Sequence, residues 1–208
     1  MDVLEVYERD YDPKKPVVCL DEKSKQLLED ARAIMGTKPG HIRKRDYEYI
    51  RHGTINCFVA VEPKGKRRTV VVRKKKKKRD FAHVINYLLT RPYKVVEKLV
   101  LVTDNLNTHN ETALTETFGE EKGKHLYNRI EWHYTPKHGS WLDMAEIEIG
   151  ILSRQCLKKP IATYQKMRYE VACWVKERND KKKGINWKFT REKAREKFQL
   201  DKTGILIE

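Results

Sequence analysis

The chain has 208 residues, enough to bury one good hydrophobic core, so we expect one domain with tails. The sequence shows no signal peptide and no apolar stretch near the length of a membrane span, which excludes an integral membrane protein and favours a cytoplasmic one. Its four cysteines lack the spacing of zinc ligands. The net charge of +15 favours a nucleic acid as partner, because basic side chains gain affinity by displacing counterions from phosphates.

The first half of the chain predicts three strands in succession. Residues 1–16 are charged and end in a proline-rich segment, which is typical of a linker. The apolar run 17–20 ends at Asp21 and predicts a short buried strand. A second strand lies within 47–61 and a third at 68–72, with the turn sequence Pro63-Lys64-Gly65 between them. These two strands therefore predict a hairpin.

Helices and strands alternate after that hairpin. A helix capped by Asp80 precedes a strand at 99–103, and a helical stretch at 112–126, interrupted at Gly119, precedes a strand at 130–134. Helices at 141–157 and 163–178 follow, and then a basic tail, 179–208, with a short helix at 190–198. This order predicts an α/β fold in which residues 17–178 form a ribonuclease-H-like mixed five-stranded sheet flanked by helices.

Seven basic residues in a row connect the third strand to the next helix. Such a run is consistent with a loop that tracks phosphates, with a nuclear-localisation signal, or with a solvated loop. We favour phosphate tracking, because a basic loop at a sheet end would steer a polyanion toward nearby acidic residues. The predicted DNA-binding residues are Arg73, Lys74, Lys75, Lys76, Lys77, Lys78 and Arg79.

Three acidic residues carry the chemical prediction. Asp21 and Asp104 each follow a short β-branched run, so each carboxylate is expected at the carboxyl end of a strand. Glu146 lies early in the helical stretch that can pack over those strand ends. Carboxylates arranged in this way hold pairs of divalent cations for phosphoryl transfer, which predicts a metal-dependent nuclease. The neighbouring Glu22 and Glu148 are expected to point away from this site as surface charges.

Four sequence blocks resemble a known family. Pro16-Val-Val-Cys-Leu-Asp-Glu-Lys23 and Tyr47-Glu-Tyr-Ile-Arg-His-Gly-Thr54 are similar to its first blocks. Leu101-Val-Thr-Asp-Asn-Leu-Asn-Thr-His109 and Tyr134-Thr-Pro-Lys-His-Gly-Ser-Trp-Leu-Asp-Met-Ala-Glu146 are similar to the segments that carry its second and third acids. The family is that of bacterial insertion-sequence transposases in the mariner superfamily, the DDE superfamily endonucleases. The blocks follow the family's order and span nearly the whole chain.

The resemblance implies a reaction and a set of site residues. It assigns Asp21, Asp104 and Glu146 as the catalytic and metal-binding Asp, Asp and Glu, which would hold two Mg²⁺ or Mn²⁺ ions. It implies cleavage of DNA at transposon ends and transfer of the freed 3′-OH into target DNA, by a dimer on DNA at the bacterial nucleoid. Residues close in sequence to these acids are possible accessory groups: His109 or His138 would orient a phosphate or a scissile-strand group, or would be a satisfied structural histidine. The accessory residues are Asn105, His109, His138 and Asp143.

Two departures from the family pattern leave alternatives open. Asp143 stands where the family usually has Asn, so it would act as a spare ligand or would repel the scissile phosphate. The first catalytic strand also begins too early for the family's N-terminal helix-turn-helix region, so we expect the catalytic part only, with end recognition by a separate chain. The alternatives are a non-catalytic DNA-binding transposase remnant, inactive without that region, and another ribonuclease-H-like nuclease.

Overall fold

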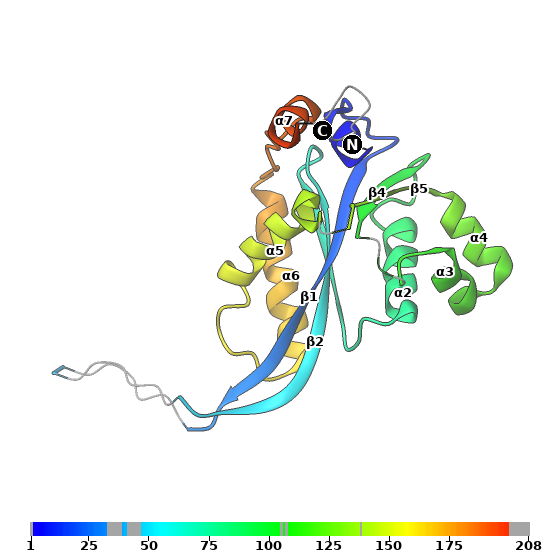
Figure 1. Ribbon diagram of the computed structural model, residues 1–208. Coiled ribbons are helices and arrows are strands. Elements are labelled where there is room, and N and C mark those ends of the chain that lie inside the picture. The colour runs from blue at the N-terminus through cyan, green and yellow to red at the C-terminus, as the bar shows by residue number, and fades with distance from the viewer. Residues whose placement is uncertain are drawn as a thin grey trace.

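Five strands form one mixed sheet at the centre of the molecule (Figure 1). The computed structural model describes residues 2–32, 39–40, 47–104, 106, 108–137 and 139–199. The strand order is β3-β2-β1-β4-β5; β2 runs antiparallel to both β1 and β3, β4 runs parallel to β1, and β5 runs parallel to β4. The predicted hairpin and mixed sheet are therefore present. The strands are β1 (Val17–Asp30), β2 (Tyr49–Glu62), β3 (Arg67–Arg73), β4 (Leu99–Thr103) and β5 (Ile130–Tyr134).

Helices cover both faces of the sheet (Figure 1). On one face, α2, α3 and α4 pack against alternate residues of β1 and β2, among them Leu20 and Phe58. On the other face, α1 and α5 pack near Cys19, and α5 and α6 pack over Cys57 and Val59. The helices are α1 (Asp2–Glu8), α2 (Lys78–Thr90), α3 (Glu111–Phe118), α4 (Glu120–Asn128), α5 (Met144–Gln155), α6 (Tyr164–Asp180) and α7 (Arg191–Phe198).

The first strand is much longer than its apolar run predicts. β1 continues from Asp21 to Asp30, because its polar second half stays paired with β2 as far as the Asp30–Tyr49 pair. The two strands run on as a ribbon beyond the helices (Figure 1). The register shifts between Gln26 and Leu28, opposite Gly53, whose φ of +82° suits glycine. The expectation that Asp21 ends its strand is therefore wrong.

The predicted linker contains a helix that belongs to the core. Within the expected linker 1–16, α1 buries one apolar face against β1 and α5. The Tyr7 hydroxyl donates a hydrogen bond of 2.8 Å to the Leu142 carbonyl, which ties α1 to the turn before α5. The charged residues that suggested a linker, such as Glu5 and Glu8, occupy the exposed face of this helix. A linker is thus the wrong interpretation of residues 2–8.

The remaining helices lie close to their predicted positions. α2 begins at Lys78, with Asp80 in its first turn accepting a hydrogen bond of 3.1 Å from the backbone N–H of Lys77. A 3₁₀ turn, Ser140–Leu142, precedes α5, so the predicted helical stretch from residue 141 is really a turn followed by a helix. In the expected tail, α7 forms and Ala194 is buried near α1. Over the part of the chain that is described, no helix has the length and apolarity needed to cross a membrane.

Candidate active site

The pairing of β1 with β4 brings the two aspartates together. The parallel register ends at the pair Leu20–Thr103; Asp21 is the next residue of β1, and Asp104 is the first residue after β4. Asp21 shares its strand face with Cys19, which packs beneath α1 and α5, so its side chain lies on the α5 side of the sheet. Asp104 follows the end of β4 directly, with its side chain 30% exposed.

Glu146 reaches the same neighbourhood from α5. The residue lies in the first turn of the helix and is exposed, while its neighbours Met144 and Ala145 are buried against β1 and β2. The charges of Glu146 and Asp104 both act on Asp21 and raise its pKa. The charges of Asp104 and Glu146 therefore reach Asp21, and the assignment of these three residues as one site stays a prediction. Within the described part of the chain, no three His, Cys, Asp or Glu side chains are arranged as the ligands of a metal ion.

Asp21 has the perturbed pKa expected of a carboxylate in such a group. Burial raises its pKa most, and the neighbouring charges of Glu22, Asp104 and Glu146 raise it further. A hydrogen bond of 2.6 Å from the backbone N–H of Glu22 to Asp21 Oδ1 opposes these effects. The balance places the pKa at about 6, so this carboxyl is costly to ionise in the absence of a cation.

Asp143 is a buried helix cap. Its Oδ1 accepts a hydrogen bond of 2.8 Å from the backbone N–H of Ala145, at the N-cap position of α5. The residue is 2% exposed, and Oδ2 has no hydrogen-bond partner. Burial, followed by the charges of Asp21, Asp104 and Glu146, raises its pKa well above the ordinary range. A neutral Asp143 acid has nearly the shape of the Asn that the family usually carries here.

His109 connects Asp104 to Glu22. Its Nε2 lies 2.9 Å from Glu22 Oε1, and its Nδ1 lies 2.7 Å from Asp104 Oδ1 and 3.1 Å from the Thr103 hydroxyl. The ring is buried and stacks on Phe81 of α2. Burial lowers the pKa of His109, but the bonds to the two carboxylates outweigh this and raise it to about 9. The two carboxylates therefore favour the protonated form of His109.

Glu22 and Glu148 are not the exposed surface charges that the sequence predicts. Glu22 does point to the face opposite Asp21, but its side chain is only 6% exposed because it pairs with His109. Glu148 is fully buried between Arg68 and Arg178. The alternation along β1 was a usable signal for Glu22, because this residue shares its face with buried Leu20. No local signal identifies the partners of Glu148, which come from distant segments.

The predicted accessory residues Asn105 and His138 lie outside the described residues.

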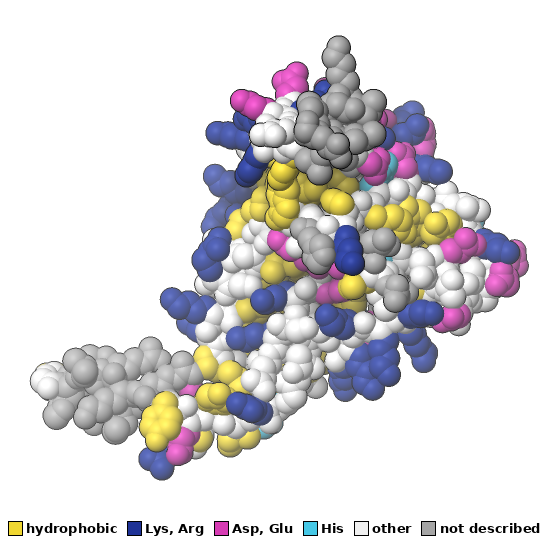
Figure 2. Space-filling view, in the orientation of Figure 1, with side chains coloured by type: hydrophobic (Ala, Val, Ile, Leu, Met, Phe, Trp, Pro, Cys, Tyr) yellow, Lys and Arg dark blue, Asp and Glu magenta, His cyan; other side chains and the backbone are white. Residues whose placement is uncertain are grey.

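The basic run lies at the start of α2, where two of its members are already paired. Arg73 Nε lies 3.1 Å from Asp80 Oδ1, and Lys78 Nζ lies 3.2 Å from Glu116 Oε1. Figure 2 shows Lys and Arg side chains gathered over the loop that leads into α2. The members of the run that remain exposed are Lys74, Lys75, Lys76, Lys77 and Arg79.

Comparison with known proteins identifies the family. The model of the family described as DDE superfamily endonuclease matches residues 16–168, so the chain belongs to that family. No curated protein matches. Among solved structures, the fold resembles the Mos1 mariner paired end complex with Mn (TM-score 0.55, 16% identity, 86% of this chain and 53% of that one). It also resembles the Mos1 Strand Transfer Complex (TM-score 0.55, 14% identity, 89% and 59%).

A third similar structure is the Mos1 transposase paired-end complex with left transposon end (TM-score 0.53, 15% identity, 86% of this chain and 54% of that one). These likenesses confirm the predicted α/β, ribonuclease-H-like fold with its mixed five-stranded sheet. The chain spans between half and three fifths of the length of these three Mos1 chains.

We predict that Asp21→Asn stabilises the metal-free protein at pH 8 but not at pH 4. The folded pKa of Asp21, about 6, is above its ordinary value of 3.8, so the native state holds this proton more tightly than the unfolded chain. Native stability is therefore lost as the pH rises from 4 to 6, and the amide removes that cost. Allowing for partial exposure, we expect a gain of about 2 kcal/mol in EDTA, measured by urea unfolding.

The matched control is Glu120→Gln, whose side chain is 75% exposed on α4. We expect this variant to change stability by less than about 1 kcal/mol at either pH. An equal gain for Asp21→Asn at pH 4 and pH 8 would contradict the proposed crowding of carboxylates around Asp21.

Proposed function

We propose that this chain is the catalytic domain of a DNA transposase that cuts DNA at transposon ends and joins the freed 3′-OH to target DNA. The observation that supports the proposal is that the charges of Asp104, just after β4, and Glu146, on α5, act on Asp21 of β1, in a chain of the DDE endonuclease family. The mariner-type fold supports the same reaction class.

The side chains of the site fit divalent cations. Asp143 Oδ2 is buried without a hydrogen-bond partner, Asp104 Oδ1 faces only Nδ1 of His109 at 2.7 Å, and the charges of Glu22, Asp104 and Glu146 act on Asp21. Hard oxygen ligands of this kind suit Mg²⁺ or Mn²⁺. We infer that Asp21, Asp104 and Glu146 would hold two such ions. When bound, the ions would lower the pKa of a water and stabilise the leaving 3′ oxygen of a phosphodiester.

The neighbouring groups would hold the ligands in place. His109, whose protonated form is favoured between Glu22 and Asp104, fixes the Asp104 carboxylate beside Asp21. The Tyr134 hydroxyl donates a hydrogen bond of 2.9 Å to the His109 carbonyl, so β5 also restrains this loop. Because its two ring nitrogens already face carboxylates, His109 serves the site better as a positioning residue than as a phosphate ligand. Asp143 would stay protonated as the cap of α5.

DNA is the proposed substrate, bound chiefly through its phosphates. The net charge of +15 and the exposed part of the basic run support binding that depends on salt and little on sequence. Recognition of the transposon ends would then come from a further DNA-reading region or chain, and the two ends would be held by a dimer. Such a substrate would place the protein at the bacterial nucleoid.

One observation favours a second candidate, a non-catalytic DNA-binding remnant. The described carboxylates do not form a ready group of metal ligands, as would be expected if the family acids persisted without a working site. This protein would bind DNA without cutting it. A different ribonuclease-H-like nuclease has less support, since the family match extends over residues 16–168.

We expect Mn²⁺-dependent nicking of supercoiled plasmid by the wild type and loss of this activity in Asp104→Asn. Removing a metal ligand costs several kcal/mol of transition-state stabilisation, so the rate should fall by about 100-fold or more. Asp180→Asn, an exposed change on α6, is the control and should nick like the wild type. Equal cleavage by Asp104→Asn and wild type would refute the site. Absence of both nicking and any Mn²⁺-induced rise in melting temperature would favour the remnant.

The basic run gives a separate prediction about DNA affinity. Each phosphate contact contributes about 0.9 to the slope of log affinity against log salt concentration. The double variant Lys75→Ala/Lys76→Ala should therefore make that slope shallower by about 2, measured by fluorescence anisotropy on a duplex of arbitrary sequence. The charge-matched control, Lys176→Ala/Lys181→Ala, removes two exposed lysines of α6 and its C-cap. An unchanged slope in Lys75→Ala/Lys76→Ala would show that binding does not use the run, and the same change in both variants would show that the run has no special role.

A further inference from the structure

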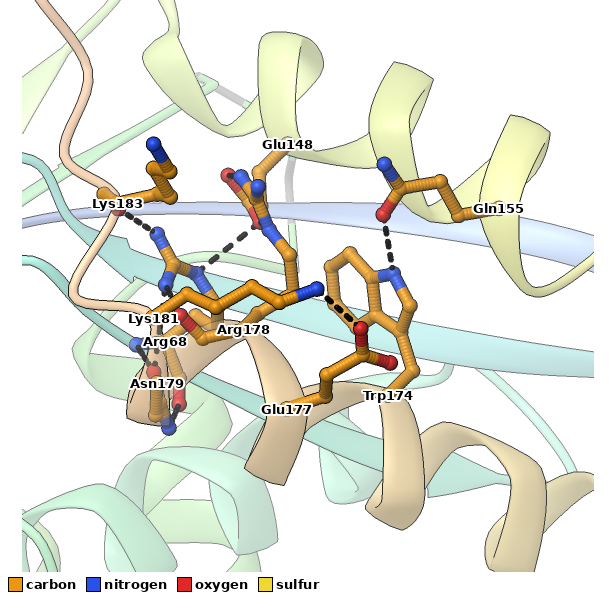
Figure 3. Close-up of polar contacts among 9 residues, drawn as sticks. All are labelled: Arg68, Glu148, Gln155, Trp174, Glu177, Arg178, Asn179, Lys181 and Lys183. Carbon is orange, nitrogen blue, oxygen red and sulfur yellow. Dashed lines mark hydrogen bonds and ion pairs between the residues drawn. The ribbon is translucent and has the colours of Figure 1, made fainter.

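A buried glutamate anchors α5 on the side opposite Glu146. The carboxylate of Glu148 is fully buried and lies between two guanidinium groups (Figure 3). Arg178 of α6 donates to both of its oxygens, from Nε to Oε1 and from Nη2 to Oε2, each at 3.1 Å. Arg68 Nε of β3 lies 3.0 Å from Oε1. We call Arg68, Glu148 and Arg178 the buried ion cluster.

Arg68 is the residue through which β3, α5 and the end of α6 meet. Its guanidinium donates to the carbonyl of Arg178 at 2.9 Å and to that of Lys183. The Asn179 side chain pairs with the Arg68 backbone, accepting from its N–H and donating to its carbonyl, both at 2.9 Å. Since β3 is an edge strand, Asn179 takes the place of a neighbouring strand at this point. Arg68 is therefore held by both its backbone and its side chain.

Burying these three charges costs desolvation free energy, so the cluster adds little net stability to the fold. Each buried charge loses its hydration, and apolar residues of similar volume often serve the fold equally well. Burial lowers the pKa of Arg68, which reflects this cost, although Glu148 opposes it. Apolar contacts are non-directional, whereas a carboxylate held by two guanidinium groups has a fixed orientation. The cluster is thus better suited to fixing the rotation of α5 about its axis than to adding to the free energy of unfolding.

The rotation of α5 about its own axis determines the direction in which the Glu146 side chain points. Glu146 and Glu148 are two residues apart, which is about 200° around a helix of 3.6 residues per turn. When Glu148 is fixed toward Arg68 and Arg178, Glu146 is directed to the other side of α5, where its charge acts on Asp21. The first turn of α5 contributes only the small Ala145 and flexible Met144 to the core beside β1, whereas Leu152, two turns further on, is fully buried over Cys57. Small and flexible side chains allow a helix to rotate more readily than large rigid ones.

We propose that the buried ion cluster is a positioning device, which sets the rotation of α5 so that Glu146 faces Asp21 and Asp104. The inference rests on the proposed function of Glu146 as a metal ligand. Glu148, Arg68 and Arg178 touch neither substrate nor metal in this scheme, and they act through the helix that they hold.

The decisive variant replaces the whole cluster with apolar residues, as Arg68→Met/Glu148→Leu/Arg178→Met. Substitution of all three avoids leaving an unpaired buried charge, so the fold should survive with a melting temperature close to that of the wild type. If this variant does not fold, Glu148→Gln replaces it, measured below its melting temperature. Glu177→Gln is the matched control, because Glu177 is a neighbouring glutamate of α6 that is paired with Lys181 at the surface.

Two readouts separate positioning from stability. The first is the half-saturating Mn²⁺ concentration for plasmid nicking, which we expect to rise about 10- to 100-fold in the apolar variant, as for other residues that orient metal ligands. The second is the distance between two spin labels, one attached at Ile147→Cys on α5 and the other at Glu120→Cys on α4. This distance is measured by double electron–electron resonance spectroscopy without metal or DNA. The accessible Cys156 and Cys173 are replaced by serine in this background.

We expect the apolar variant to shift or broaden the label distances and weaken the response to Mn²⁺, with Glu177→Gln unchanged in both. A stable apolar variant with wild-type distances and a wild-type Mn²⁺ response would overturn the proposal, because packing alone would then position α5. Failure of the wild type to bind Mn²⁺ or nick DNA would refute the proposed function instead. In that case the label distances alone decide whether the cluster sets the rotation of α5.

Discussion

The parallel register between β1 and β4 is the constraint on which the site depends. The register ends at Leu20 and Thr103, so Asp21 and Asp104, the next residues along the chain, both leave the same end of this strand pair. A shift of one residue would move Asp21 to the opposite face of the sheet. The buried, apolar residues on both faces of β1 prevent such a shift. The chemistry therefore rests on strand packing, and α5 needs only to add the third acid.

The same arrangement carries an electrostatic cost that shapes the surroundings of the site. Asp21, Asp104 and Glu146 repel one another, and this repulsion acts with burial to raise the pKa of Asp21. The structure offsets part of the cost by favouring a protonated His109 between Asp104 and Glu22, and by favouring a neutral Asp143 beneath α5. Divalent cations would offset the remainder. Crowded carboxylates with perturbed pKa values are typical of functional sites.

The sequence predicted the parts of the fold that local patterns specify. The apolar runs of β4 and β5, the hairpin of β2 and β3, and the helices α2 to α6 follow from periodicity and turn residues, as does the expected closeness of Asp21, Asp104 and Glu146. The features that the sequence did not predict depend on contacts between segments that are far apart in the chain. The charged helix α1 belongs to the core because β1 and α5 cover its apolar face. The polar second half of β1 remains a strand because β2 pairs with it. Glu148 is buried because Arg68 and Arg178 form ion pairs with it.

The central claim, that these three carboxylates hold divalent cations, is tested most directly by a crystal of the protein soaked in Mn²⁺ and measured at the manganese absorption edge. The account predicts anomalous density within about 2 Å of carboxylate oxygens of Asp21 and Asp104, with Glu146 turned toward it. Manganese bound only elsewhere on the protein, or a site that stays empty at saturating Mn²⁺, would contradict it.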